Sequence, residues 1–207
     1  VLDNLMYDQN VLLEHYINPN FSFVYGDIRD RKVVQGLVEQ SDAVIHLASI
    51  VGAPACKKNE TLAKEVNVDG TKNIIDFISN NQILLFASTG SVYGKIEGMC
   101  DEDWEPNPLS LYGSTKLEGE LMALNLPNSV AFRFATAYGL SPRLRLDLLP
   151  NDFVLNAIRN KYLVVYDKKF RRTFIHVTDI VRSYLHMLEN IETVKGNAFN
   201  IGSEENN

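Results

Sequence analysis

The hydrophobic pattern of the chain alternates between two kinds of segment. Short runs that are almost entirely apolar are separated by longer stretches in which apolar residues recur every three or four positions. The short runs are typical of parallel strands that are covered on both faces, and the longer stretches are typical of amphipathic helices. The sequence therefore predicts parallel strands joined by crossover helices, which is a doubly wound α/β fold.

The predicted elements follow directly from these two patterns. We expect strands over residues 21–25, 43–47, 83–87, 130–134, 163–166 and 198–201, and helices over residues 30–39, 60–79, 111–124, 151–159 and 177–188. The character of the chain changes after Gly139, where Pro142 and Pro150 interrupt the pattern. We therefore expect one domain over residues 1–140 and a smaller lobe over 141–207, with 173–190 returning to the first domain.

The two ends of the chain predict that it is a fragment of a longer protein. Only Val1 and Leu2 precede Asp3, so the strand that ends there is nearly absent, and there is no initiator methionine. At the other end, residues 200–202 resemble a strand that runs into a turn, with no helix after it. We expect the first strand of the sheet to be missing from this chain and the smaller lobe to be incomplete.

Composition and charge exclude several classes of function. The chain has 207 residues, 45% hydrophobic and 22% charged, which is enough to bury one sizeable core. A net charge of −6 gives no field that attracts nucleic acid or anionic membranes. Cys56 and Cys100 suggest neither a disulfide framework nor a metal site, and no apolar run could span a bilayer. We expect a cytoplasmic protein without a metal.

The candidate chemistry lies where the predicted strand 83–87 ends. The segment ASTGSVYG at 87–94 places hydroxyl groups at the carboxyl edge of the sheet, where ligands of such folds bind. Tyr112 and Lys116 are one helical turn apart, so the ammonium could lower the pKa of the phenol from its usual value of about 10. The pair alone is common by chance, and a surface Tyr and Lys packed along a helix is the alternative interpretation.

Eight segments together carry a resemblance that no single motif could. In this order and spacing they resemble the extended short-chain dehydrogenases, especially the NAD-dependent nucleotide-sugar epimerases and dehydratases. The resemblance covers nearly the whole chain. The segments are VLDN (1–4), GDIRD (26–30), DAVIHLAS (42–49), NVDGTKNII (67–75), ASTGSVYG (87–94), YGSTK (112–116), RFATAYG (133–139) and RTFIHVTDI (172–180).

The resemblance implies a Rossmann-like dinucleotide-binding domain with a catalytic group and a cofactor site. Tyr112 is the expected acid/base, Lys116 its partner and a ligand of the nicotinamide ribose, and Thr89 the residue that binds the reacting sugar hydroxyl. The carboxylate of Asp3 is expected to accept hydrogen bonds from the adenosine ribose hydroxyls. Because it would repel a 2′-phosphate, it favours NAD over NADP. Asp27 is expected to contact adenine, although it could instead cap the helix after it. The other expected cofactor contacts are Asn4, Ile28, Leu47, Ala48, Ser49, Asn67, Ala87, Ser88 and Phe134.

The substrate-binding residues that the resemblance implies lie mainly in the smaller lobe. They are Thr89, Ser91, Thr136, Asn151 and Arg172. Thr136 is a departure, because many relatives have Asn there. Asn151 and Arg172 match positions that bind a diphosphate, which helix amides and a guanidinium both suit.

Several other polar residues are expected to have no role in ligand binding. A solvated basic turn is the alternative interpretation of Arg172, and a surface role is expected for its neighbours Lys168, Lys169 and Arg171. We expect His46 and His176 to be structural, because the first lies inside an apolar strand and the second fits the structural pattern of the family.

The resemblance and these residues favour NAD-dependent epimerisation of a nucleotide-diphosphate sugar through a keto-sugar intermediate. In 4,6-dehydratases an Asp-Glu pair follows the hydroxyl residue, and here Gly90 and Ser91 occupy those positions. The alternatives are a nucleotide-sugar reductase or dehydratase, or a non-catalytic regulatory protein, since the glycine-rich GxxGxxG turn is missing. The family also implies a homodimer that pairs helices 60–79 and 111–124.

Overall fold

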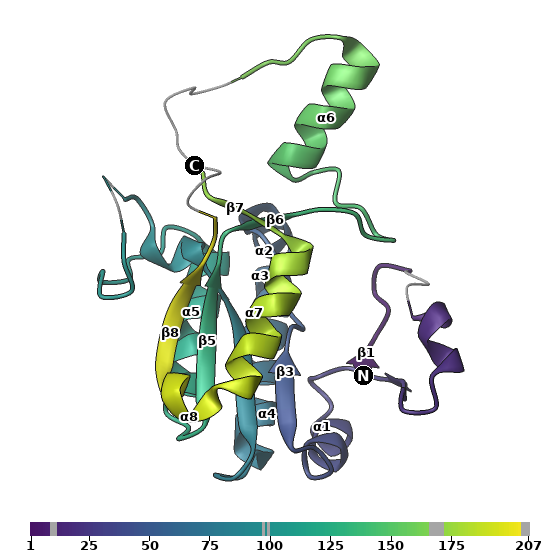
Figure 1. Cartoon of the computed structure of the whole chain (residues 1–207), viewed down its shortest axis with the longest axis vertical. Coiled ribbons are helices and arrows are strands. Elements are labelled where there is room, and N and C mark those ends of the chain that lie inside the picture. The colour runs from purple at the N-terminus through teal and green to yellow at the C-terminus, as the bar shows by residue number, and fades with distance from the viewer. Residues whose placement is uncertain (9–11, 97, 99, 166–171, 204–207) are drawn as a thin grey trace.

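The computed structural model describes residues 1–8, 12–96, 98, 100–165 and 172–203 and shows an α/β fold built on parallel strands (Figure 1). This confirms the predicted fold class. The strands are β1 (Leu2–Asp3), β2 (Val24–Tyr25), β3 (Ala43–His46), β4 (Ile83–Thr89), β5 (Ser129–Phe134), β6 (Thr136–Tyr138), β7 (Phe174–His176) and β8 (Asn197–Ile201). The helices are η1 (Leu13–Ile17), α1 (Arg31–Val38), α2 (Ala53–Lys58), α3 (Glu60–Lys64), η2 (Glu65–Asp69), α4 (Gly70–Phe77), η3 (Gly90–Tyr93), α5 (Leu111–Leu124), α6 (Leu149–Asn160), α7 (Val177–Glu189) and α8 (Ile191–Val194).

The core is a four-stranded parallel sheet with helices on both faces. Its strand order is β3-β4-β5-β8. One face packs with α1, α4 and α5 around a cluster that includes Phe86 and Ala131, and the other packs with α7 around Leu85 and Phe132. Figure 1 shows α7 in front of this sheet and α5 behind it. Leu84, Leu85, Phe86, Val130 and Phe132 have no exposed surface, as their continuous apolar runs predict.

The remaining strands form two small parallel pairs. β1 pairs with β2 over two residues, and β6 pairs with β7 over three. Within the described residues β1 has no partner except β2, and β3 none except β4. The sheet is therefore interrupted between β1 and β3, at the place where the first strand of a doubly wound order stands.

Two predicted elements differ from the structure. Residues 163–165 form no strand and are exposed, and residue 166 lies outside the described residues. A β-branched run without a neighbouring strand cannot pair its backbone, so its strand propensity has no effect. The predicted helix 60–79 is three consecutive elements, α3, the π-helix η2 and α4, and it ends at Phe77. Such π-turns inside helices often mark functional sites.

The segment between β6 and β7 is the least packed part of the described chain. None of the residues of α6 is buried, and Figure 1 shows this helix standing apart from the sheet. By contrast, β8 and α7, which follow it, lie on the main sheet. No helix among the described residues is both long and apolar enough to cross a membrane.

Candidate active site

The carboxyl end of β4 supplies the first part of the site. Thr89 ends this strand in an extended conformation and is 8% exposed. Its hydroxyl accepts a hydrogen bond from the Ser91 amide at 3.2 Å and caps the short helix η3. The side chain is thereby fixed at the sheet edge where ligands of this fold class bind.

The start of α5 brings Tyr112 to Thr89. Ser110 caps the helix by accepting a hydrogen bond from the Gly113 amide at 3.1 Å. Gly113 lies against η3 so closely that a Cβ there would be 2.8 Å from the Ser91 carbonyl oxygen, so only glycine fits. This close approach brings the side chain of Tyr112 to that of Thr89, which acts on the Tyr112 pKa.

Burial controls the protonation of the candidate acid/base. Desolvation raises the pKa of Tyr112, while the side chain of Thr89 and the charge of Arg145 act in the opposite direction. Lys116 is not among the groups that act on this pKa, although its spacing from Tyr112 predicts such an effect. With no ligand bound, the phenol is therefore protonated at neutral pH.

Lys116 is buried one turn after Tyr112 and is 3% exposed. Its Nζ atom lies 4.3 Å from the centroid of the Phe86 ring, and Gly119 leaves room for that ring. Within the described residues the ammonium has no hydrogen-bond acceptor, so its donors are available to a ligand. Desolvation lowers its pKa to about 7, and the carboxylate of Glu120 opposes this shift.

Asn67, in the π-helix η2, forms hydrogen bonds with the loop after β3 and with α5. Its amide donates to the Ile50 carbonyl at 3.1 Å and to the Thr115 hydroxyl at 3.0 Å, and its oxygen accepts from the Ile50 amide at 2.7 Å and the Ser49 hydroxyl at 2.9 Å. These bonds use all four polar positions of the side chain. Asn67 therefore joins the loop after β3 to α5 in this structure, and its predicted contact with a cofactor stays a prediction.

The ends of β1 and β2 gather a second group of predicted residues. One carboxylate oxygen of Asp3 accepts a hydrogen bond from the Leu5 amide at 2.6 Å. Asn4 donates to Asp27 at 2.9 Å, and Arg29 also binds Asp27, with Nε at 3.0 Å from its carboxylate. This guanidinium lowers the pKa of Asp27 to about 2.

A shallow pocket lies beside this group. Ile28 is 8% exposed and belongs to the core, and its carbonyl accepts a hydrogen bond from Asn73 at 2.9 Å. Asp30 caps α1 by accepting from the amides of Lys32 and Val33, so the alternative that Asp27 caps this helix is wrong. The pocket is lined by Asp27, Arg29, Asp30, Arg31, Glu65, Asp69 and Asn73.

The other predicted cofactor residues lie at or just after the ends of β3, β4 and β5. Leu47, Ala48 and Ser49 follow β3, and Leu47 is 59% exposed. Phe134 packs its ring against Phe132 and Tyr184 on the α7 side, so only its backbone faces the end of β4. Ala87 and Ser88 lie in β4 immediately before Thr89.

Apart from Thr89, the predicted substrate residues lie in η3, at the start of β6, in α6 and just before β7. Ser91 is exposed in η3, and Thr136 starts β6, where its amide donates to the Thr173 carbonyl at 3.1 Å. Asn151 lies in α6 and donates to the Arg145 carbonyl at 2.9 Å. Arg172 is exposed before β7.

Several of the residues expected to have no ligand role are also located. His46 is buried and shares a hydrogen bond of 2.9 Å with Thr71, and His176 caps α7, so both histidines are structural as predicted. Cys56 and Cys100 are free thiols. Lys168, Lys169 and Arg171 lie outside the described residues.

Sequence reasoning missed a buried ion pair beneath the site. Glu120 and Arg133 lie 2.7 Å apart and are 0% and 7% exposed. Two signals could have revealed it: Glu120 follows Lys116 by one helical turn, and Arg133 is a charge inside the apolar strand VAFRF. A buried charge requires a partner, so each predicts the other.

Comparison with known proteins supports the resemblance on sequence and on structure. The chain is 28% identical to CDP-paratose 2-epimerase of Salmonella typhi over 88% of its length, and 31% identical to UDP-N-acetyl-alpha-D-glucosaminuronate decarboxylase of Bacillus cytotoxicus over 90%. It spans 64% and 61% of those two proteins.

Solved structures give the same result. The UDP-glucuronic acid 4-epimerase of Bacillus cereus, in complex with UDP-glucuronic acid and NAD, matches with a TM-score of 0.85 and 26% identity. That match covers 98% of this chain and 68% of the other. A dTDP-glucose 4,6-dehydratase of Streptomyces venezuelae with NAD bound matches with a TM-score of 0.82 and 26% identity, over 97% of this chain and 65% of the other.

The match to a family extends over nearly the full sequence, from residue 1 to residue 202. It includes the strand end that carries Thr89, the helix that carries Tyr112 and Lys116, and the paired strands that carry Asp3 and Asp27. The chain belongs to the NAD dependent epimerase/dehydratase family.

Proposed function

We propose that this chain carries the catalytic group and part of the NAD site of a nucleotide-sugar epimerase. The observation that supports this most directly is the proximity of the Tyr112 and Thr89 side chains at the end of β4, with the buried ammonium of Lys116 one helical turn away. A phenol beside a second hydroxyl group suits the transfer of a proton to and from a sugar hydroxyl.

The residues that would hold NAD fit its chemistry at two places. Lys116 has donors without an acceptor in the described chain, which suits the hydroxyl groups of a ribose. Asp3 ends β1 with only one carboxylate oxygen engaged by the Leu5 amide, and a carboxylate there suits adenosine ribose hydroxyls and repels a 2′-phosphate. When bound, NAD supplies the acceptor and donor of a hydride.

The chain's own residues handle the proton in this reaction. Tyr112, once deprotonated, removes the proton from a sugar hydroxyl that Thr89 orients, as the carbon–hydrogen bond of the same carbon breaks and a C=O double bond forms. The resulting keto-sugar then rotates within the site and presents its opposite face. Tyr112 then returns the proton to the oxygen as the carbon regains hydrogen on its opposite face, so the cofactor ends unchanged.

The residues after Thr89 favour epimerisation over elimination of water. Elimination from the sugar requires an additional acid and base. Gly90 has no side chain and the hydroxyl of Ser91 does not ionise near neutral pH, so neither supplies that pair. A keto-sugar reductase is the second candidate, because it would use the same three side chains but would consume its cofactor.

The proposal is tested by Tyr112→Phe. The purified protein is incubated with NAD and UDP-, GDP- or dTDP-sugars, and the products are separated by chromatography. Loss of the acid/base should reduce conversion by about 100-fold or more. Tyr162→Phe, at an exposed position, is the matched control and should convert normally. Full conversion by Tyr112→Phe would remove this residue from the mechanism, and net formation of NADH or consumption of added NADH would favour the reductase.

A further inference from the structure

A carboxylate with no exposed surface lies directly behind the candidate catalytic pair. Glu120 follows Lys116 by one turn of α5. Its Oε1 atom accepts hydrogen bonds from Nε and Nη2 of Arg133 at 3.0 and 2.7 Å, and its Oε2 atom accepts one from the Ser88 hydroxyl. One side chain therefore joins α5 to β4 and β5.

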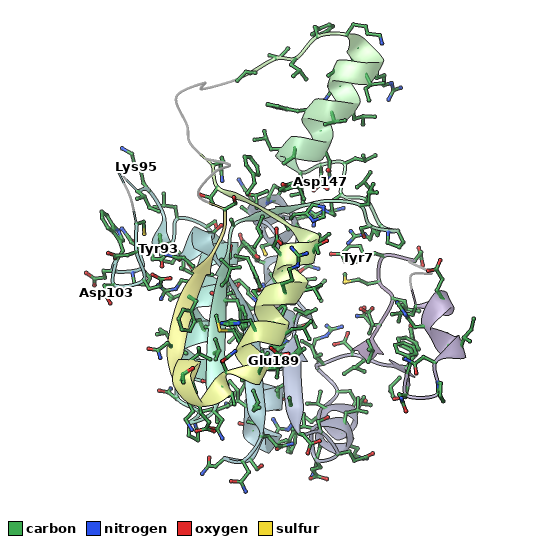
Figure 2. The ribbon with its side chains drawn as sticks, viewed as in Figure 1. Tyr7, Tyr93, Lys95, Asp103, Asp147 and Glu189 are labelled. Atoms are coloured by element: carbon green, nitrogen blue, oxygen red, sulfur yellow. The ribbon has the colours of Figure 1, made fainter. Side chains whose placement is uncertain are left out.

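The same guanidinium extends the network to the edge of the sheet. Nη1 of Arg133 donates to the Tyr93 hydroxyl at 2.6 Å and to the Glu102 carbonyl at 3.1 Å. The Tyr93 hydroxyl donates to Asn200 of β8 at 2.8 Å. Figure 2 shows Tyr93 beside the sheet, at the end of η3, and Asp103 farther out on the same side.

The position of this ion pair is more informative than its contribution to stability. A buried ion pair adds little net stability compared with apolar residues of the same size, since the cost of desolvation offsets the attraction. However, Ser88 directly precedes Thr89 on β4, and Glu120 directly follows the turn that begins with Lys116. The carboxylate thus fixes the register between the strand that carries Thr89 and the helix that carries Tyr112 and Lys116.

We propose that Glu120 is a positioning residue, which acts with Arg133 and Ser88 to hold Lys116 charged and in place beside Tyr112 and Thr89. This inference rests on the proposed function, because it assumes that Lys116 serves the reaction. Because Arg133 also donates to the Glu102 carbonyl, it connects residue 102 to α5 through Glu120.

The groups that face Lys116 make Glu120 its source of negative charge. His46 of β3 has its pKa lowered to about 3 by burial, so the ring is neutral at pH 7. The thiol of Cys56, from α2, has its pKa raised by burial and is neutral as well. Of the described groups that act on the Lys116 pKa, Glu120, which forms the ion pair with Arg133, is therefore the one whose negative charge favours the ammonium.

The direct test replaces the carboxylate with an amide of the same shape, Glu120→Gln. In protein labelled with ¹³C-lysine, the Cε resonance of Lys116 is followed against pH and assigned with Lys116→Met. Loss of the neighbouring charge should lower the Lys116 pKa from about 7 by about one unit or more. Turnover should fall about 10-fold with KM changed less than about threefold, and its loss at high pH should begin at a lower pH.

Two further variants separate positioning from simple loss of stability. Leu85→Ala removes a side chain with 0% exposure from the opposite face of β4 and should destabilise the fold without changing the Lys116 pKa. Glu120→Asp keeps the charge but shortens the side chain. It should therefore keep the Lys116 pKa and still lower turnover. If Glu120→Gln does not fold, the loss of turnover in Glu120→Asp, set against Leu85→Ala, still tests the inference.

The result that overturns the inference is a Lys116 pKa and a turnover number in Glu120→Gln that match those of Leu85→Ala. This failure is distinct from failure of the proposed function. An unchanged Lys116 pKa in Glu120→Gln together with an inactive Tyr112→Phe contradicts the positioning role alone. A shifted Lys116 pKa together with a fully active Tyr112→Phe contradicts the proposed reaction.

Discussion

The two groups of strands that carry the predicted site are built very differently. The central strands β4 and β5 are largely buried, and the polar side chains of Asn67, Glu120 and Arg133 around them have hydrogen-bonding partners. The β1-β2 pair has two residues in each strand, and Val1 and Tyr25 are 61% and 72% exposed. The proton-handling half of the site is therefore held rigidly by the core, whereas the half that would meet adenosine is held by a few surface hydrogen bonds.

The largest effect is expected where a buried charge loses its partner. Arg133→Met leaves Glu120 buried without a counter-charge and should reduce the free energy of unfolding by about 3–5 kcal/mol. Arg31→Met breaks the exposed pair with Asp76 and should cost less than about 1 kcal/mol. Urea unfolding at pH 7 measures both. Equal losses in the two variants would contradict the difference expected between a buried and an exposed ion pair.

Much of this contrast could be predicted from the sequence, but its polar details could not. The apolar runs predict β4 and β5 because a continuous hydrophobic strand needs cover on both faces. They cannot reveal that Asn67 lies in a π-helix, because a five-residue segment is too short to show a hydrophobic period of its own. They also mislead at 163–165, where Val164 and Val165 are 56% and 55% exposed and have no neighbouring strand among the described residues.

The candidate site likewise contains residues that the sequence could predict and contacts that it could not. Tyr112 and Lys116 could be predicted because helical spacing fixes which side chains share a face. The partner of Arg133 depends on which helix covers β5, and this is a property of the tertiary structure. Asp27 could be placed at a strand end, but its ion pair with Arg29 depends on how the turn after β2 folds back.

A smaller effect is expected at the contact between α5 and β4. A Cβ at Gly119 would lie 2.7 Å from the Phe86 ring, so Gly119→Ala should cost about 1–3 kcal/mol although alanine favours helices. Gly36→Ala in α1 is the matched control, because no atom lies within 4 Å of its added Cβ. It should stabilise the protein by about 0.5–1 kcal/mol. Thermal and urea unfolding compare them, and stabilisation by both substitutions would show that Phe86 has room to move.

The smallest effect is expected at the β1-β2 edge, and it should depend on pH. Arg29 lowers the pKa of Asp27 from 3.8 to about 2, so this carboxylate contributes stability that is present above pH 3.8 and is lost as the pH falls through 2. Because solvent screens this partly exposed pair, the contribution at pH 7 should be about 1 kcal/mol or less. Asp27→Asn should therefore be less stable than the parent at pH 7 and about equal to it near pH 2, as measured by urea unfolding. The same substitution in an Arg29→Met background should have a much smaller effect at pH 7, and an undiminished effect there would mean that Arg29 is not the source of the shift.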